Sequence, residues 1–118
     1  MADRITLRIF DIVGSPIWVS TEDGQKVYEK ITTAFKARRS VDLSFFYREN
    51  LITAFLNAAI GQLYNGEYDE DFLKEHLAFV DISADDKLML ERAVANAKRY
   101  FANRTAYDQA WGDVVDEE

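Results

Sequence analysis

A nearly continuous apolar run over residues 41–46 meets a long helical pattern over residues 51–64 at one polar corner, Tyr47-Arg48-Glu49-Asn50. An apolar strand of this kind is typical of a central, well-covered position in a sheet. A strand that leads through a short corner into a helix predicts an α/β fold. Ligands and partners of such folds bind at the carboxyl ends of the strands. Because the corner holds no cysteine, histidine or glycine-rich loop, it is predicted to serve recognition rather than chemistry.

The rest of the pattern predicts one α/β domain over residues 1–111, followed by an acidic, frayed C-terminal tail over residues 112–118. Apolar residues at alternate positions indicate strands, and apolar residues three or four positions apart indicate helices. The turn residues Gly14-Ser15-Pro16 separate the first two strands, which are expected to pair as a hairpin. The predicted strands cover residues 5–13, 17–19, 41–46 and 77–82, and the predicted helices cover residues 22–38, 51–64, 68–76 and 84–109.

Polar residues at the element ends support these helix boundaries. Ser20 and Thr21 can accept a hydrogen bond at the start of the first long helix. Asn50 is the expected N-cap of the helix over residues 51–64, and Asn65-Gly66 is expected to end it. Ser83, three residues before Asp86, approximates a capping box for the last helix.

The composition predicts a soluble, cytoplasmic protein. The 118-residue chain is 48% apolar and 14% aromatic, enough for a core in a single domain. It has no cysteine, which excludes disulfides and thiolate zinc sites. Neither a signal peptide at the start nor an apolar run near the roughly 20 residues of a membrane span is present. No membrane association is therefore expected.

The negative charge lies in the second part of the chain. Residues 1–50 carry eight Lys and Arg against seven Asp and Glu, a net of +1, whereas residues 51–118 carry six against fourteen, a net of −8. Nucleic-acid binding is not expected, since phosphate affinity requires clustered basic residues. A solvating surface explains the acids most simply. An alternative function follows from the same imbalance: an acidic inhibitor or nucleic-acid mimic of the kind that phages encode.

No catalytic, metal or cofactor site is expected. The single histidine, His76, is interpreted as a residue on a helix surface, with no second ligand at metal-site spacing. The acids around Asp69 and Asp86 lie in helix starts and loops, so they are expected to be solvated. Trp18 is assigned to the sheet, Trp111 is left open, and Ser44 is interpreted as a small residue that permits close packing.

Four segments carry a resemblance to a known family. Residues 10–15 read Phe-Asp-Ile-Val-Gly-Ser, residues 23–28 read Asp-Gly-Gln-Lys-Val-Tyr, residues 54–64 read Ala-Phe-Leu-Asn-Ala-Ala-Ile-Gly-Gln-Leu-Tyr, and residues 93–101 close the pattern. Together with the order of elements, they resemble the STAS-like domain family of unknown function, a relative of the STAS domains of anti-sigma-factor antagonists. The resemblance implies a mixed sheet of about four strands with helices packed mainly on one face.

The resemblance also implies a non-catalytic regulatory domain that binds a protein partner. In STAS antagonists, a histidine-kinase-type ATPase phosphorylates a serine between the strand and the helix. In this chain Ala54 holds the matching position, so Thr53 is the candidate phosphoacceptor. The partner is expected to be such an ATPase or an anti-sigma-like regulator, and the oligomeric state is left open. The partner is expected to dock through the strand-to-helix segment over residues 47–57, and the predicted partner-binding residues in it are Arg48, Asn50, Thr53, Ala54 and Asn57.

Overall fold

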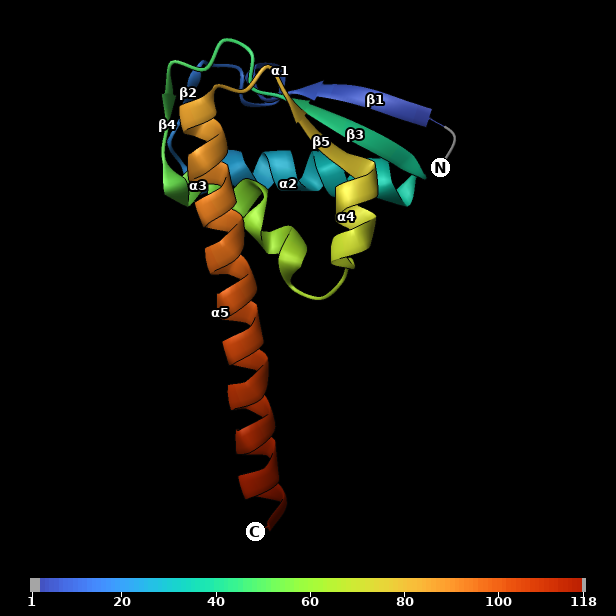
Figure 1. Ribbon diagram of the computed structural model, residues 1–118, viewed down its shortest axis with the longest axis vertical. Coiled ribbons are helices and arrows are strands. Elements are labelled where there is room, and N and C mark those ends of the chain that lie inside the picture. The colour runs from blue at the N-terminus through green and yellow to red at the C-terminus, as the bar shows by residue number, and fades with distance from the viewer. Residues whose placement is uncertain (1–2, 118) are drawn as a thin grey trace.

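The computed structural model describes the backbone of residues 3–117 and the side chains of residues 3–102. Three strands form one sheet and two short strands form another, and helices connect them (Figure 1). The strands are β1 (Asp3–Arg8), β2 (Ile17–Trp18), β3 (Arg39–Ser44), β4 (Asn50–Leu51) and β5 (Leu77–Val80). The helices are α1 (Ile9–Val13), α2 (Thr21–Lys36), α3 (Thr53–Ala59), the 3-10 helix η1 (Gly61–Tyr64), α4 (Glu70–His76) and α5 (Ala84–Glu117).

All strand pairings in the described residues are parallel. The larger sheet has the order β1-β3-β5, so the apolar strand β3 is central, as predicted. The expected hairpin is wrong, because β2 pairs with β4 rather than with β1. The expected mixed sheet is therefore replaced by a three-stranded parallel sheet and a two-stranded parallel ribbon. The predicted placement of the helices mainly on one face stays a prediction.

The strand predicted over residues 5–13 stops early. Its second part is the helix α1, which ends at Gly14 in the left-handed conformation, with a φ of 81°. The Gly14 N–H donates to the carbonyl oxygen of Phe10 at 2.8 Å. A continuous apolar run fits a buried helix as well as a strand, and the glycine decides where this helix ends.

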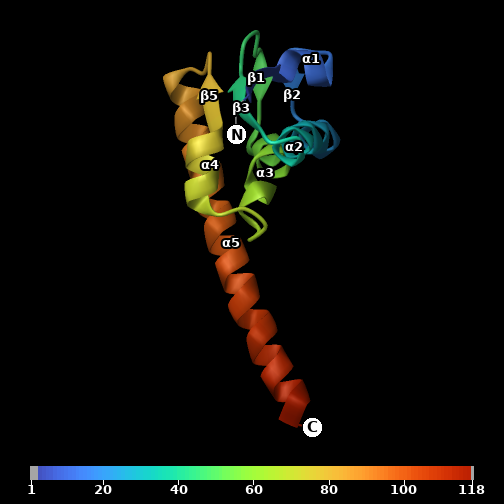
Figure 2. The same cartoon turned by 90° about the vertical axis from the view of Figure 1, so that its right-hand side faces the viewer.

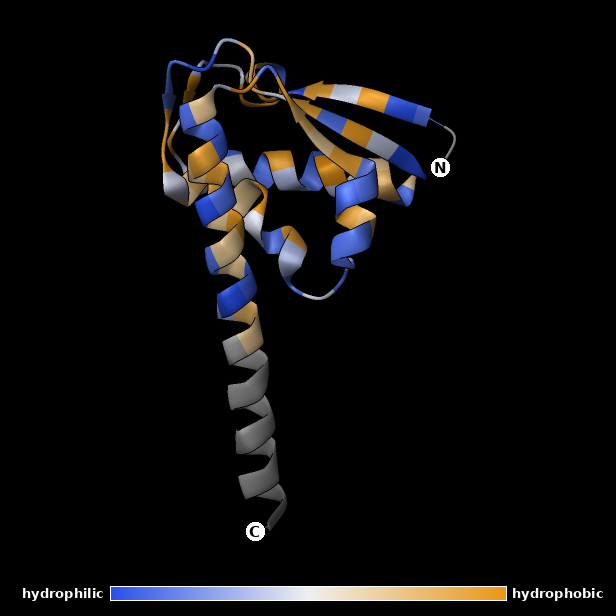
Figure 3. Ribbon diagram, in the orientation of Figure 1, coloured by the Kyte–Doolittle hydropathy of each residue, from blue (hydrophilic) through white to orange (hydrophobic). Residues whose placement is uncertain are grey.

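The core lies between the larger sheet and the helices α2 and α3. Along β1, exposed and partly buried residues alternate, a pattern that Figure 3 shows in hydropathy. Val41 and Leu43 of β3 are fully buried, and so are Val27 and Ile31 of α2. In Figure 2, α1 and α2 lie to one side of β3, and α4 and α5 lie to the other.

The predicted start of α2 is confirmed, and the helix over residues 51–64 requires correction. The Ser20 hydroxyl oxygen accepts a hydrogen bond from the Asp23 N–H at 3.0 Å. Asn50 is not an N-cap, because it pairs in β4; α3 begins after Ile52, without a side-chain cap. The helical pattern then divides into α3 and η1. It ends before Gly66, whose φ is 105°.

The helices α2 and α3 lie close together at Gly24. A Cβ atom at this position would lie 2.6 Å from the Phe55 carbonyl oxygen and 2.7 Å from the Ala58 Cβ atom. Real Cβ atoms are essentially never this close to another atom. Gly24 thus sets the distance between the two helices, and with it the position of the corner that precedes α3.

The helix α5 begins where the capping box predicted it. The Ser83 hydroxyl oxygen accepts a hydrogen bond from the Asp86 N–H at 3.1 Å. The helical backbone continues to Glu117, through the segment expected to be a tail. The side chains from residue 103 onward, including Trp111, lie outside the described residues, so the domain boundary after residue 111 stays a prediction. The first part of α5 packs on η1 and α3.

Candidate docking surface

The corner begins with a hydrogen-bonded connection between the ends of β3 and β5. Ser44, which is 1% exposed, donates from its hydroxyl to Asp81 Oδ2 at 2.7 Å and accepts from the Phe46 N–H at 3.3 Å. The sequence suggested only that Ser44 is small enough to permit close packing. The structure shows in addition that its hydroxyl forms two hydrogen bonds in the interior. Tyr47 and Asp81 both adopt a left-handed backbone, with φ of 64° and 55°. A left-handed backbone raises the conformational energy of any residue other than glycine, so it persists only where the surrounding structure fixes it. The two residues therefore indicate that the turns at this edge of the sheet are held in one conformation.

An ion pair connects the corner to the first turn of α5. Arg48 Nε lies 2.7 Å from Asp86 Oδ2, and the Asp86 side chain is only 7% exposed. The expectation that Asp86 is solvated is wrong, because the fold brings it against the corner. The Arg48 side chain keeps 30% of its surface exposed, so it lies at the edge of any docking surface here.

We expect Arg48→Met to lower the free energy of unfolding by about 1–3 kcal/mol, because it leaves the buried Asp86 carboxylate without its charged partner. Urea unfolding followed by circular dichroism measures the loss. The matched control is Arg4→Met, which breaks the more exposed Arg4–Asp42 pair at 2.6 Å and should cost less than about 1 kcal/mol. Equal losses in the two variants would show that the Arg48–Asp86 pair contributes no more than a surface pair.

The ribbon of β2 and β4 presents one apolar face to solvent and one to the core. Trp18 pairs with Leu51, and both side chains are buried. Ile17 pairs with Asn50, and both are exposed. The Ile52 N–H donates to the Trp18 carbonyl oxygen at 3.3 Å, which places Ile52 next to Val19 at the end of the ribbon. The outward face therefore carries Ile17, Val19, Asn50 and Ile52.

The start of α3 continues the exposed surface. Thr53, Ala54 and Asn57 are exposed, whereas Phe55 and Leu56 face the core. Thr53 also lines a cavity of about 330 Å³ with residues of α5, including Asp85, Leu88 and Arg92. The structure thus places the predicted partner-binding residues along one segment, with Asn50 on the ribbon and Arg48 in its ion pair.

Exposed apolar side chains gather at the same end of the molecule. Seven large apolar side chains are exposed in the described part of the chain, and six of them lie in or directly beside the ribbon and the corner, or near the start of α5. These six are Ile17, Val19, Phe46, Tyr47, Ile52 and Leu88. Single exposed apolar residues are ordinary, but a cluster of them indicates an interaction site. Alternate residues of a strand face opposite sides, so a buried Trp18 implies that Ile17 and Val19 face solvent. This inference was not drawn from the sequence.

Aromatic residues at and beside the corner contact one another. The rings of Phe46 and Tyr47 have centroids 4.2 Å apart, and Phe10 of α1 lies 5.6 Å from Tyr47. The Arg8 guanidinium lies 5.2 Å from the centre of the Phe46 ring. A cavity of about 400 Å³ between Phe10, Pro16 and Tyr47 opens beside them. Aromatic residues are enriched at protein interfaces relative to the rest of the surface.

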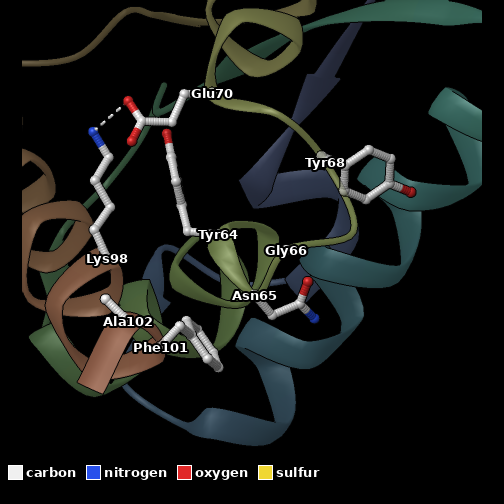
Figure 4. A pocket seen from close by; sticks show the side chains of 8 residues that line it. All are labelled: Tyr64, Asn65, Gly66, Tyr68, Glu70, Lys98, Phe101 and Ala102. Carbon is white, nitrogen blue, oxygen red and sulfur yellow. Dashed lines mark hydrogen bonds and ion pairs between the residues drawn. The ribbon is translucent and has the colours of Figure 1, made fainter. Parts of the chain in front are cut away.

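The acidic helix α4 and its neighbours contain two polar contacts away from the corner. His76 is not a free surface residue: its side chain is 15% exposed, and its Nδ1 lies 2.8 Å from the Ser40 hydroxyl oxygen. Glu70 pairs with Lys98 of α5 at 3.0 Å, beside Tyr64, at a cavity of about 260 Å³ (Figure 4). Burial raises the pKa of Tyr64, and the charge of Glu70 raises it further, so its ring stays neutral at physiological pH.

No three histidine or carboxylate side chains in residues 3–102 are grouped so that they could hold a metal ion. In the same part of the chain, none of the helices combines the length and the apolar composition that crossing a membrane requires.

Comparison with known proteins identifies the family. A family model described as a STAS-like domain of unknown function matches residues 23–87, more than half of the chain. The matched region runs from the first turn of α2 to the first turn of α5, and it contains the whole corner. No curated protein and no solved structure matches the chain. The chain therefore belongs to the STAS-like domain family of unknown function.

Proposed function

We propose that this protein is a non-catalytic regulatory domain that docks a partner protein through the end formed by the ribbon, the corner and the start of α3. The observation that carries the proposal is the gathering there of six of the seven exposed large apolar side chains in the described residues. Burial of apolar surface is the dominant favourable contribution to most protein–protein association. The proposed partner is a histidine-kinase-type ATPase or an anti-sigma-like regulator, by analogy with the STAS antagonists.

The rigidity of this end supports the proposal. The ribbon is anchored in the core by Trp18, and the corner is held by the Arg48–Asp86 ion pair and the Ser44–Asp81 hydrogen bond. A preformed surface loses little conformational entropy on binding, so more of its contact energy becomes affinity. For the alternative, an acidic inhibitor, two of the fourteen acids of residues 51–118 are less available, because Asp86 and Glu70 form ion pairs within the domain.

Exchanging the outward apolar residues for lysine should weaken docking. We expect Ile17→Lys and Ile52→Lys each to weaken binding by roughly thirtyfold, the effect of losing an interface hot spot. Both side chains are at least 40% exposed, so the fold should tolerate the changes. Titration calorimetry against each candidate regulator encoded by the host genome measures the affinity.

The matched control for docking is Tyr100→Lys, which changes a 58% exposed apolar residue on α5, away from the ribbon. Its affinity should equal that of the unchanged protein. If no candidate regulator binds, or if the two isoleucine variants bind as tightly as the control, the proposed docking surface is wrong.

Thr53 is the proposed phosphoacceptor of the docking surface. Its side chain is exposed at the start of α3, and Arg92 lines the same cavity. A phosphate would add about −1.5 to −2 charges at this point and change the fit of a partner. After incubation with ATP and the candidate kinases, mass spectrometry should find phosphate on Thr53 and none on Thr53→Val. Absence of phosphate from the unchanged protein would remove Thr53 from the proposal and leave the docking surface to be judged by calorimetry.

A further inference from the structure

A second apolar cavity lies on the other side of α5 from Thr53. Its volume is about 550 Å³, within the range of small-molecule sites. Figure 1 shows the elements that bound it, with α4 and β5 on one side and α5 on the other. Apolar side chains from β5, from the segment that follows it, from α5 and from η1 form most of the lining: Phe79, Ile82, Leu90, Val94 and Tyr64.

Lysines surround this cavity. Lys74, Lys87 and Lys98 line it together with one acid, Glu91. This local excess of positive charge contrasts with the net charge of −8 over residues 51–118. Lys98 is paired with Glu70 and lies 5.5 Å from the centre of the Tyr64 ring. Lys74 and Lys87 are exposed, and neither takes part in an ion pair with another described residue.

The third lysine of the lining, Lys98, is already paired with Glu70 outside this cavity. Lys98 and Tyr64 line both this cavity and the smaller one, which Figure 4 shows. The unpaired lysines Lys74 and Lys87 come from α4 and from the first turns of α5. An apolar ligand body can therefore lie against Leu90 and Val94, while an anionic group reaches the two unpaired ammonium groups.

We propose that this cavity binds a small amphiphilic anion, namely a medium-chain carboxylate whose apolar chain fills the space between β5 and α5. The apolar lining supplies the affinity, since each methylene removed from water contributes about 0.8 kcal/mol. The lysines supply the preference for a negative headgroup over a neutral or positive one. The site is separate from the docking surface, because α5 lies between them, and the proposal does not depend on a protein partner.

Decanoate, below its aggregation concentration, is the probe. Titration calorimetry and amide chemical shifts of the isotope-labelled full chain should show saturable binding, with shift changes at Phe79, Leu90 and Val94. Decyltrimethylammonium, which has the same chain and the opposite charge, should bind at least tenfold more weakly. Changing Lys74 and Lys87 together to Gln should weaken decanoate binding about fivefold, the effect of two exposed charge contacts. The control Lys30→Gln, on α2, should leave binding unchanged.

A blocking variant tests whether the binding occurs in this cavity. Ala95 is exposed and lines the cavity, so Ala95→Trp should fill its mouth without changing the core and should abolish binding. Asn96→Trp, at the next exposed position of the same helix, should bind decanoate as the unchanged protein does. Failure of decanoate to saturate, equal binding of the cationic probe, or binding that survives Ala95→Trp would each overturn the proposal.

Discussion

Trp18→Ala should lower the free energy of unfolding by about 3–5 kcal/mol, the usual cost of removing a fully buried large aromatic side chain. The Trp18 ring stacks on Phe55 of α3 at 6.0 Å between centroids and meets Phe45 edge-on at 5.8 Å. Its indole N–H donates to the Ser15 carbonyl oxygen at 2.7 Å. The substitution thus removes both the packing and the hydrogen bond that hold the ribbon on the domain. Urea unfolding monitored by circular dichroism measures the loss.

The neighbouring position gives the control for Trp18. Ile17 is 46% exposed in the same strand, so Ile17→Ala should change stability by less than about 1 kcal/mol. Trp18→Ala should in addition weaken partner docking, because the outward residues would no longer be held in one arrangement. A loss below about 1 kcal/mol for Trp18→Ala would mean that the ribbon is held by its backbone hydrogen bonds instead.

Gly24→Ala should also lower the free energy of unfolding, by about 1–3 kcal/mol. This is the opposite of what the same change does at most helix positions. At an exposed helix position, replacing Gly by Ala gains up to about 1 kcal/mol. Here the new methyl group would lie 2.6 Å from the Phe55 carbonyl oxygen, so α2 and α3 must move apart. Thermal and urea unfolding measure the change in the free energy of unfolding. A decrease, rather than the usual increase, would indicate that the new methyl group is crowded.

Relief of the crowding tests the cause of the Gly24 effect. Ala58→Gly removes the Cβ atom that would lie 2.7 Å from the new methyl group. In the background of Gly24→Ala it should therefore cost less than it costs alone, a coupling that a double-mutant cycle detects. The rescue should be partial, because the contact with the Phe55 carbonyl oxygen remains. A stabilised Gly24→Ala variant would contradict the close approach of the two helices.

Local patterns were sufficient where one interpretation fitted the sequence. The helix α2 was predicted because Val27, Ile31 and Phe35 repeat at helical spacing after a capping serine, and the structure has it at Thr21–Lys36. The apolar run of α1 suited a strand equally well, so the predicted strand extended too far. The pairing of β2 with β4 depends on residues far apart in the chain, which no local pattern reports.

In the candidate site too, some features follow from local patterns and others depend on residues far apart in the chain. The exposure of Thr53, Ala54 and Asn57 follows from the helical pattern, which turns Phe55 and Leu56 inward. The pairing of Arg48 with Asp86 could not be predicted, because the chain offers many acids and only the fold selects one of them.

The all-parallel pairing has a consequence for how the domain assembles. In each strand pair, at least one helix separates the two strands along the chain. The pairs are β1 with β3, β2 with β4, and β3 with β5. Such distant pairings close large loops before they gain contacts, which slows folding relative to helical or hairpin-rich domains of the same size. During synthesis, the ribbon cannot form before Leu51 emerges, and Arg48 gains its partner only when Asp86 does. The ion pair that holds the corner is thus among the last contacts of the domain to form, because Asp86 follows both the ribbon and the last strand of the larger sheet along the chain.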